Sequence, residues 1–347
     1  MRIAIIGAGV VGLQAAYRAV SEGIEVTVYE QAAELGFGAS GHTAGVLHVL
    51  QPPFINRKAR LAKKANPLYD GLAAELGFRI LRMPLYLVYT SRKERFLGVF
   101  AASLLKLVGY KASLANRDEV VSSCPEISSD VIGGVKVEGY GTVIPKEVLK
   151  ALAKGILEKG GSIIYSAKVE SIREHNQKVC INHINGSECY DKVVIAAGPG
   201  VVNLVQGKIP KIGYYKGVMV YVKFDCNSII APLVSRARSK ETKGGGIIPL
   251  PDGRVLLGPS FIETQDPWDT KVSTEEVFST IDLYSKLLPD TPKILSADAG
   301  TRSKNLSKDD FYIDKKGRII VTAGIDSPGF TASPLIADII IRLATFP

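Results

Sequence analysis

The first thirty residues place the strongest constraint on how this chain can fold. The apolar run RIAII at 2–6 is followed by GAGVVG at 7–12, a further stretch ending at Gly23, and the β-branched run IEVTVYE at 24–30. The first run predicts a short buried strand, the stretch before Gly23 a helix, and the last run a second strand. The chain therefore begins with a complete βαβ unit, which is typical of an α/β fold.

The loop of this unit contains three glycines with GxGxxG spacing, Gly7, Gly9 and Gly12. Such glycines permit a tight turn, close approach of the backbone to a pyrophosphate, and close packing of the helix on the strand. The helix N-terminus adds a partial positive charge facing the phosphates. Glu30 ends the second strand, where a carboxylate would accept hydrogen bonds from ribose hydroxyls. Together these features predict a dinucleotide site.

Length and charge limit the remaining possibilities. At 347 residues the chain exceeds one ordinary core, so we expect two domains, interleaved or in series. The net charge of +9 favours anionic substrates or an anionic surface. Nucleic acid is not expected as a partner, because the basic residues are dispersed and no zinc-finger spacing accompanies them. No stretch of about eighteen apolar residues predicts a membrane span.

The four cysteines show no CxxC spacing and are too few for a disulfide scaffold. They are Cys124, Cys180, Cys189 and Cys226. This pattern predicts no metal site and fits a reducing cytoplasm.

The rest of the chain predicts further strands and a last helix. Residues 160–198 indicate short strands joined by hairpins, with turns at HNQK and at Asn185-Gly186. Runs of β-branched residues between 208 and 297 predict a separate, largely antiparallel sheet. The segment 324–343 predicts a loop and then a helix with an apolar face, which we expect to pack in the core rather than on a membrane.

Four blocks resemble the flavin-dependent oxidoreductases of the D-amino-acid oxidase and glycine oxidase superfamily. They are GAGVVG at 7–12, GASGHTAGVLH at 38–48, VVIAAGPG at 193–200 and GIDSPGFTASP at 324–334. The resemblance implies FAD rather than NAD, because this superfamily closes a C-terminal loop over the flavin. It implies an α/β (α+β) fold, in which a Rossmann-like FAD-binding domain with a β-meander is interleaved with a substrate domain on a mostly antiparallel sheet. The expected boundaries are 1–80, 141–205 and 298–347 for the FAD-binding domain, and 81–140 and 206–297 for the substrate domain.

The resemblance also implies roles for single residues. The ADP half would be held by Gly7, Gly9, Gly12 and Glu30, and the adenine by Val169. The pyrophosphate and ribitol would be approached by Ser40 and Gly41, and Ala197 and Gly198 would allow a close approach of the backbone. The isoalloxazine ring would be faced by Gly329, Phe330 and Thr331. We expect the last helix to begin at residues 332–334, so that its first N–H groups stabilise negative charge on the reduced flavin.

Further segments are similar to FAD-dependent glycerol-3-phosphate dehydrogenases and oxidases. They are PPFINRKARLAKKANPLYDGLAAELGF at 52–78, TKGGGIIPLPDGRVLLGPS at 242–260 and AGTRSKNLSKDDFYI at 299–313. The similarity implies oxidation of sn-glycerol 3-phosphate to dihydroxyacetone phosphate by hydride transfer to flavin N5. Electrons would then pass to a quinone or to a carrier protein.

Such a reaction needs a base and a cationic side chain that binds the anionic substrate. His48 is the candidate base, because a neutral imidazole suits proton abstraction near neutral pH. Arg302 is the candidate anion clamp, since its planar fork binds phosphate or carboxylate in bidentate fashion. Lys243 is a candidate second positive charge. His42 occupies the position at which dimethylglycine and sarcosine dehydrogenases bond covalently to the flavin, and whether it does so here stays open.

Several alternatives remain at this stage. The substrate of the flavin could instead be an amino acid, an N-methyl amino acid or a 2-hydroxy acid, or the chain could be a flavin-binding subunit without activity of its own. The cluster Arg57, Lys58, Arg60, Lys63 and Lys64 is expected to be a solvated helix face, with docking on an acidic partner or anionic lipid as the alternative. We expect a cytoplasmic protein, and leave open a peripheral position on the inner face of the membrane, a membrane-anchor partner and a homodimer.

Overall fold

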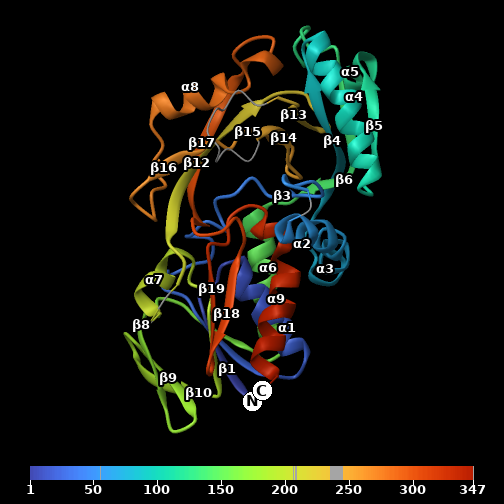
Figure 1. The fold of residues 1–347 in the computed structure, drawn as a ribbon. Helices are drawn as coiled ribbons and strands as arrows, with labels where there is room; N and C mark the ends of the chain where they lie inside the picture. Colours follow the sequence, from blue (N-terminus) through green and yellow to red (C-terminus); the bar gives the residue numbers. More distant parts are fainter. Residues whose placement is uncertain (55, 206, 208, 235–244, 347) are drawn as a thin grey trace.

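The computed structural model describes residues 1–54, 56–205, 207, 209–234 and 245–346. Its fold is mixed α/β, with one large sheet at each end of the molecule (Figure 1). The predicted βαβ unit is confirmed, since β1 (Arg2–Ile6) and β2 (Glu25–Tyr29) pair in parallel and α1 (Val10–Ser21) connects them. Lys243 lies outside the described residues.

The first sheet carries this unit at its centre. Its strands lie in the order β18 (Tyr312–Lys316), β19 (Ile319–Ala323), β11 (Lys192–Ile195), β1, β2 and β7 (Ser162–Ile164). All neighbours pair in parallel except β18 with β19. Because helices cover a parallel sheet, the interior of its central strands is largely apolar, and Ile3, Ala4 and Ile5 of β1 are fully buried.

Three helices pack together beside this sheet. Figure 1 shows α1, α6 (Pro145–Glu158) and α9 (Gly329–Thr345) side by side, and α1 contacts both of the others. Ile336, Ile340 and Ile341 of α9 are buried in the same core. The expectation that the last helix packs in the core is therefore confirmed. Among the described helices, none is long and apolar enough to cross a membrane.

The predicted hairpins form a meander beside the first sheet. Its strands are β8 (Val169–His175), β9 (Lys178–His183) and β10 (Gly186–Tyr190), which pair in antiparallel fashion. The turn between β8 and β9 places Asn176 and Gln177 at positive φ, and Gly186 opens β10 at a φ of 140°. These are turn positions that the local sequence favours.

The second sheet is larger and mostly antiparallel, as predicted. Its order is β16 (Ile262–Thr264), β12 (Ile212–Lys223), β15 (Val255–Gly258), β14 (Gly246–Pro249), β13 (Ile229–Pro232), β4 (Leu81–Tyr89), β6 (Gly133–Thr142) and β3 (Val46–Leu47), with β17 (Lys293–Asn305) beside β12 and β5 (Ala112–Asn116) beside β6. Only β13 and β4 pair in parallel among these described strands. The domain boundaries expected from the sequence stay a proposal, and β17 runs across the one at residue 298.

Further helices lie around the second sheet. At its outer edge are α4 (Arg92–Leu107) and α5 (Arg117–Ser123), and α8 (Thr274–Asp282) lies against β12 (Figure 1). Between the two sheets lie α2 (Arg57–Ala65) and α3 (Leu68–Leu76), with α2 packed on α9.

The cysteines differ from expectation. Cys124 pairs with Cys226 and Cys180 with Cys189, so all four form disulfides. The second pair lies directly opposite on β9 and β10, and the first joins segments that are 102 residues apart. Cysteine spacing alone revealed neither pair. Disulfides are rare in a reducing cytoplasm outside hyperthermophiles, so these two do not support the compartment expected from the sequence.

Candidate active site

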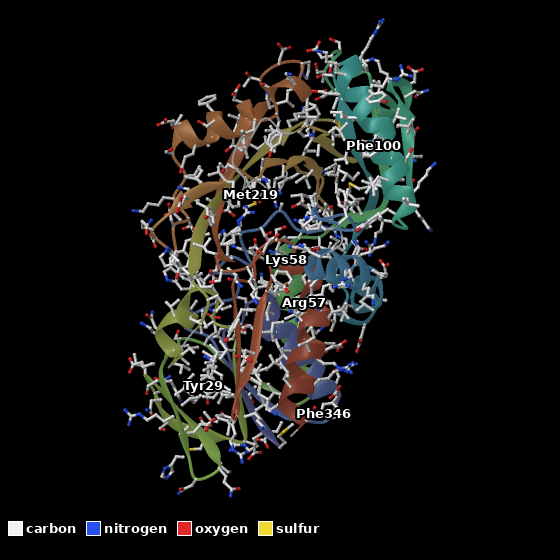
Figure 2. All side chains as sticks on the ribbon, viewed as in Figure 1. Tyr29, Arg57, Lys58, Phe100, Met219 and Phe346 are labelled. Carbon is white, nitrogen blue, oxygen red and sulfur yellow. A yellow bond between two sulfur atoms is a disulfide. The ribbon has the colours of Figure 1, made fainter. Side chains whose placement is uncertain are left out.

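A continuous cavity of about 1370 Å³ is lined by both sheets. Tyr29 of β2 lines it from the first sheet and Met219 of β12 from the second, and Figure 2 labels both. Its volume exceeds the roughly 300–1,000 Å³ of ordinary ligand pockets, so it has room for a dinucleotide together with a small substrate.

Most residues singled out in the sequence line this cavity. They are Gly7, Gly9, Glu30, Ser40, His42, His48, Val169, Ala197, Gly198, Arg302, Gly329, Phe330 and Thr331. Gly12 and Gly41 lie behind the lining, where they pack against backbone. A Cβ on Gly12 would lie 2.0 Å from the Gly7 carbonyl oxygen, and one on Gly41 would lie 2.1 Å from that of Gly36. Any side chain there would displace the loops that form the cavity wall.

The nucleotide end of the cavity is built from backbone groups at the start of α1. Gly7 has a φ of 103°, and a Cβ there would lie 2.5 Å from the Ala196 carbonyl oxygen. The Ala8 N–H donates to Glu30 Oε2 at 2.8 Å, and the Val10 N–H donates to Ser40 Oγ at 3.0 Å. The Glu30 carboxylate is thus fixed at the cavity wall while lone pairs remain for a ligand hydroxyl.

Helix α9 starts at the same edge of the first sheet as α1, because β19, which leads into it, runs parallel to β11 and β1. We expected this helix to start at residues 332–334, but it begins at Gly329. Pro334 lies inside the helix, where it cannot donate to the carbonyl oxygen of Phe330. That oxygen instead accepts hydrogen bonds from the hydroxyls of Tyr69 and Ser333. Tyr69 thereby permits the earlier start, which leaves the first-turn amides of Phe330 and Thr331 beside the cavity.

Thr331 connects this helix start to the segment that carries His48. Its Oγ1 accepts from the His48 N–H and donates to the Val46 carbonyl oxygen, both at 3.1 Å. The Asn66 side chain donates to the Leu47 carbonyl oxygen at 2.8 Å. The backbone that presents His48 is therefore held from two sides.

The His48 imidazole faces the cavity, with the Tyr140 ring edge-on at 6.1 Å between ring centroids. The surrounding protein removes water from the ring, and this burial lowers the pKa of His48 to about 4. His48 is therefore neutral at pH 7 and able to accept a proton.

Arg302 of β17 lies in the wall of the same cavity. Its guanidinium is 5.1 Å from the centre of the Phe261 ring, and Nη2 donates a long hydrogen bond of 3.5 Å to the Ser260 carbonyl oxygen. Burial lowers its pKa, while Asp326 acts in the opposite direction from a distance. In the described part of the chain, no carboxylate forms an ion pair with Arg302. A cation in this setting is a strong candidate for binding an anionic ligand.

His42 has a carboxylate partner that the sequence did not reveal. Its Nδ1 lies 2.9 Å from both oxygens of Asp298 on β17. Burial works against the charged carboxylate, but His42 and the Ala299 N–H hold the pKa of Asp298 below its usual range. The pair orients the imidazole ring in the cavity wall.

The basic cluster on α2 is only partly the solvated face that we expected, since Arg60 and Lys64 are exposed but Lys58 is not. Lys58 is buried, and its Nζ forms ion pairs with Asp326 and, at 3.3 Å, with Asp309. Arg57 pairs with Asp310 at 3.4 Å. Because Asp326 lines the cavity just before α9, the Lys58 ion pair fixes the loop that leads into this helix. The pairing joins residues more than 260 positions apart, so local sequence carried no signal for it.

These groups fit FAD. Gly7 and Gly9 keep the backbone free of side chains at the cavity wall, where a Cβ on Gly9 would lie 3.2 Å from Ser40 Oγ, and the first residues of both α1 and α9 line the cavity. Ser303 Oγ, buried in the cavity wall, has no hydrogen-bond partner among the described residues, so a polar group of a bound ligand would satisfy it.

Comparison with known proteins agrees with this geometry. The model of the DAO family, FAD dependent oxidoreductase, matches residues 2–343. A glycerol 3-phosphate dehydrogenase from Caloramator mitchellensis is 25% identical over 356 residues, which cover 98% of this chain and 73% of that protein. 

Solved structures are similar in fold. The L-alpha-glycerophosphate oxidase from Mycoplasma pneumoniae, solved with FAD bound, has a TM-score of 0.90 at 20% identity and covers 100% of this chain and 95% of its own. Glycine oxidase from Geobacillus kaustophilus has a TM-score of 0.86 at 22% identity and covers 99% of this chain and 94% of its own. At these identities the structural matches establish the fold alone.

Proposed function

Because this chain belongs to the FAD-dependent oxidoreductase family, we propose that it oxidises sn-glycerol 3-phosphate to dihydroxyacetone phosphate. The observation that carries this proposal is the pairing of Arg302, a cation without a carboxylate ion-pair partner among the described residues, with neutral His48 in one cavity. The sequence similarity to a protein named glycerol 3-phosphate dehydrogenase supports the same substrate.

The reaction removes a hydride from the substrate carbon and a proton from its hydroxyl group. FAD, when bound, accepts the hydride at N5. In our proposal His48 takes the hydroxyl proton, because its imidazole is neutral and faces the cavity. Arg302 binds the phosphate through its planar fork. Lys243, which lies outside the described residues, is proposed as a second positive charge. Electrons then leave to a quinone or to another carrier.

A second candidate, which the sequence left open, is the oxidation of an amino acid or N-methyl amino acid. Arg302 would then bind the substrate carboxylate instead of a phosphate. The two candidates differ in their need for a base, because an amine that reacts as the free base has no hydroxyl proton to lose.

Anaerobic mixing of the flavin-loaded protein with each substrate tests these candidates. We expect sn-glycerol 3-phosphate to bleach the flavin absorption, and sarcosine, D-amino acids and 2-hydroxyglutarate to leave it unchanged. Bleaching by an amine but not by glycerol phosphate would reject the proposal. Acid precipitation of the same sample tests His42, since a covalent bond would keep the flavin in the pellet, whereas we expect the flavin in the supernatant.

A further inference from the structure

Helix α4 presents an apolar stripe to the outside of the molecule. Phe96, Phe100, Leu104 and Leu107 recur at helical spacing and are 77%, 67%, 37% and 84% exposed. The opposite face of α4 packs against the rest of the protein and buries residues such as Leu105. A surface helix normally has one apolar face, directed to the core, with polar residues outside. The outer stripe of α4 is therefore not explained by the packing of this chain.

Exposed basic residues flank this stripe at both ends. Arg92, Lys93 and Arg95 lie at the start of α4, and Lys106 and Lys111 lie at or just beyond its end. Cations at a helix N-terminus oppose the helix dipole, so the first three reduce helix stability. Glu94, in the same turn, accepts a hydrogen bond from the Thr90 N–H. No carboxylate of the described residues forms an ion pair with these five cations.

The stripe also adjoins the cavity. Phe100 and Leu104 line the cavity although both are exposed, so α4 lies where the cavity meets the surface. Figure 2 shows Phe100 on this outer helix. The neighbouring lining is apolar too, and includes Phe54, Leu87 and Leu233.

The two segments that the sequence suggested for membrane contact are engaged elsewhere. Helix α9 is buried against α1. On α2, Lys58 and Arg57 form ion pairs, and Lys63 donates to the Gly109 carbonyl oxygen at 2.7 Å. The apolar face of α9 and three cations of α2 are thus held by the protein itself, while Arg60 and Lys64 of α2 stay exposed.

We propose that α4 docks this protein on an anionic lipid bilayer. The apolar stripe would enter the boundary between headgroups and acyl chains, and the flanking cations would contact lipid phosphates. A second copy of the chain fits less well, because pairing two such surfaces brings like charges together. Docking would open the apolar side of the cavity toward the lipid, where a quinone dissolves. The docking extends the electron-acceptor part of the proposed function and is independent of which substrate is oxidised.

Co-sedimentation of the flavin-loaded full chain with vesicles tests this proposal. We expect binding to phosphatidylcholine vesicles that contain phosphatidylglycerol, and none to phosphatidylcholine alone. The double variant Phe96→Ser/Leu107→Ser removes two stripe residues that do not line the cavity, and should weaken binding about tenfold or more. Arg92→Gln/Lys93→Gln should weaken it about 30-fold at low salt.

The matched control is Leu157→Ser/Ile184→Ser, which removes two apolar side chains of similar exposure from other elements. It should bind vesicles as the unmodified chain does, and flavin content should be equal in all variants. The proposal is overturned if the unmodified chain does not bind anionic vesicles, or if the control loses binding equally. It is also overturned if Phe96→Ser/Leu107→Ser only converts a dimer into a monomer. Sedimentation uses no substrate, so failure here is distinct from failure of the proposed reaction.

Discussion

The two ends of the cavity are built in different ways. At the nucleotide end, backbone groups and glycines of the first thirty residues form much of the wall, and Ser40 and Val169 add to it. At the substrate end, the wall depends on the side chains of His48 and Arg302, which are 254 positions apart in the sequence. The difference teaches that a site made of backbone geometry is encoded locally, whereas a site made of converging side chains depends on the whole fold.

The largest effect should come from the backbone end. Gly12→Ala places a Cβ 2.0 Å from the Gly7 carbonyl oxygen, so the loop must move. We expect the purified variant to retain no flavin and therefore to have no activity. Flavin absorption relative to protein absorption measures this outcome.

Gly71→Ala in α3 is the matched control, because no atom lies within 4 Å of a Cβ at that position. The control should keep its flavin and be slightly more stable, since alanine favours a helix. If Gly12→Ala retained flavin as the control does, tight backbone geometry would not be what makes this end of the cavity.

The next effect in size concerns His48. His48→Gln should lower kcat by about 10²–10⁴-fold, the usual contribution of a general base, with flavin content unchanged. Stopped-flow reduction of the flavin by sn-glycerol 3-phosphate measures the loss. A reduction rate near that of the unmodified protein would reject His48 as the base.

Arg302 should have a smaller effect that appears mainly in KM. Arg302→Leu removes a charged partner of the bound anion, which costs about 2–5 kcal/mol. We expect kcat/KM for sn-glycerol 3-phosphate to fall by about 10²–10³-fold. Arg302→Lys should recover part of this, because an ammonium keeps the charge and loses the planar fork. Equal losses in the two variants would show that geometry matters more than charge at this end of the cavity.

Local patterns predicted the parts of the molecule whose contacts are local. The βαβ unit, the meander with its turns, and the glycine cradle all follow from residues that are neighbours in the chain. For the second sheet, only its mostly antiparallel character was predicted. Its strand order depends on pairings such as β12 with β17, which local pattern does not specify.

Long-range partners explain where the sequence-based expectations were wrong. We expected the last helix to start at residues 332–334, but it begins at Gly329, and the Tyr69 hydroxyl donates to the Phe330 carbonyl oxygen that Pro334 cannot reach as a donor. Lys58 belongs to a basic run and yet is buried, because Asp326 lies opposite. In both cases the decisive group lies more than 250 residues away, and a residue's own neighbours do not reveal it.

The smallest predicted effect is a pH dependence of folding stability that comes from His48 at the substrate end of the cavity. His48 has a lowered pKa of about 4 in the folded protein and about 6.5 when unfolded, so between these values the unfolded chain binds the extra proton. The contribution of His48 to stability should therefore be fully present above pH 6.5 and be lost as pH falls toward 4, by at most about 3 kcal/mol.

Urea unfolding at pH 7 and near pH 4.5 measures this loss, and the decrease in stability should be smaller for His48→Gln than for the unmodified chain. The same change at His175, which is exposed on the meander, should leave the decrease as it is. If His48→Gln also left it unchanged, His48 would bind protons equally in the folded and unfolded chain, and burial at the substrate end would not be what keeps its imidazole neutral.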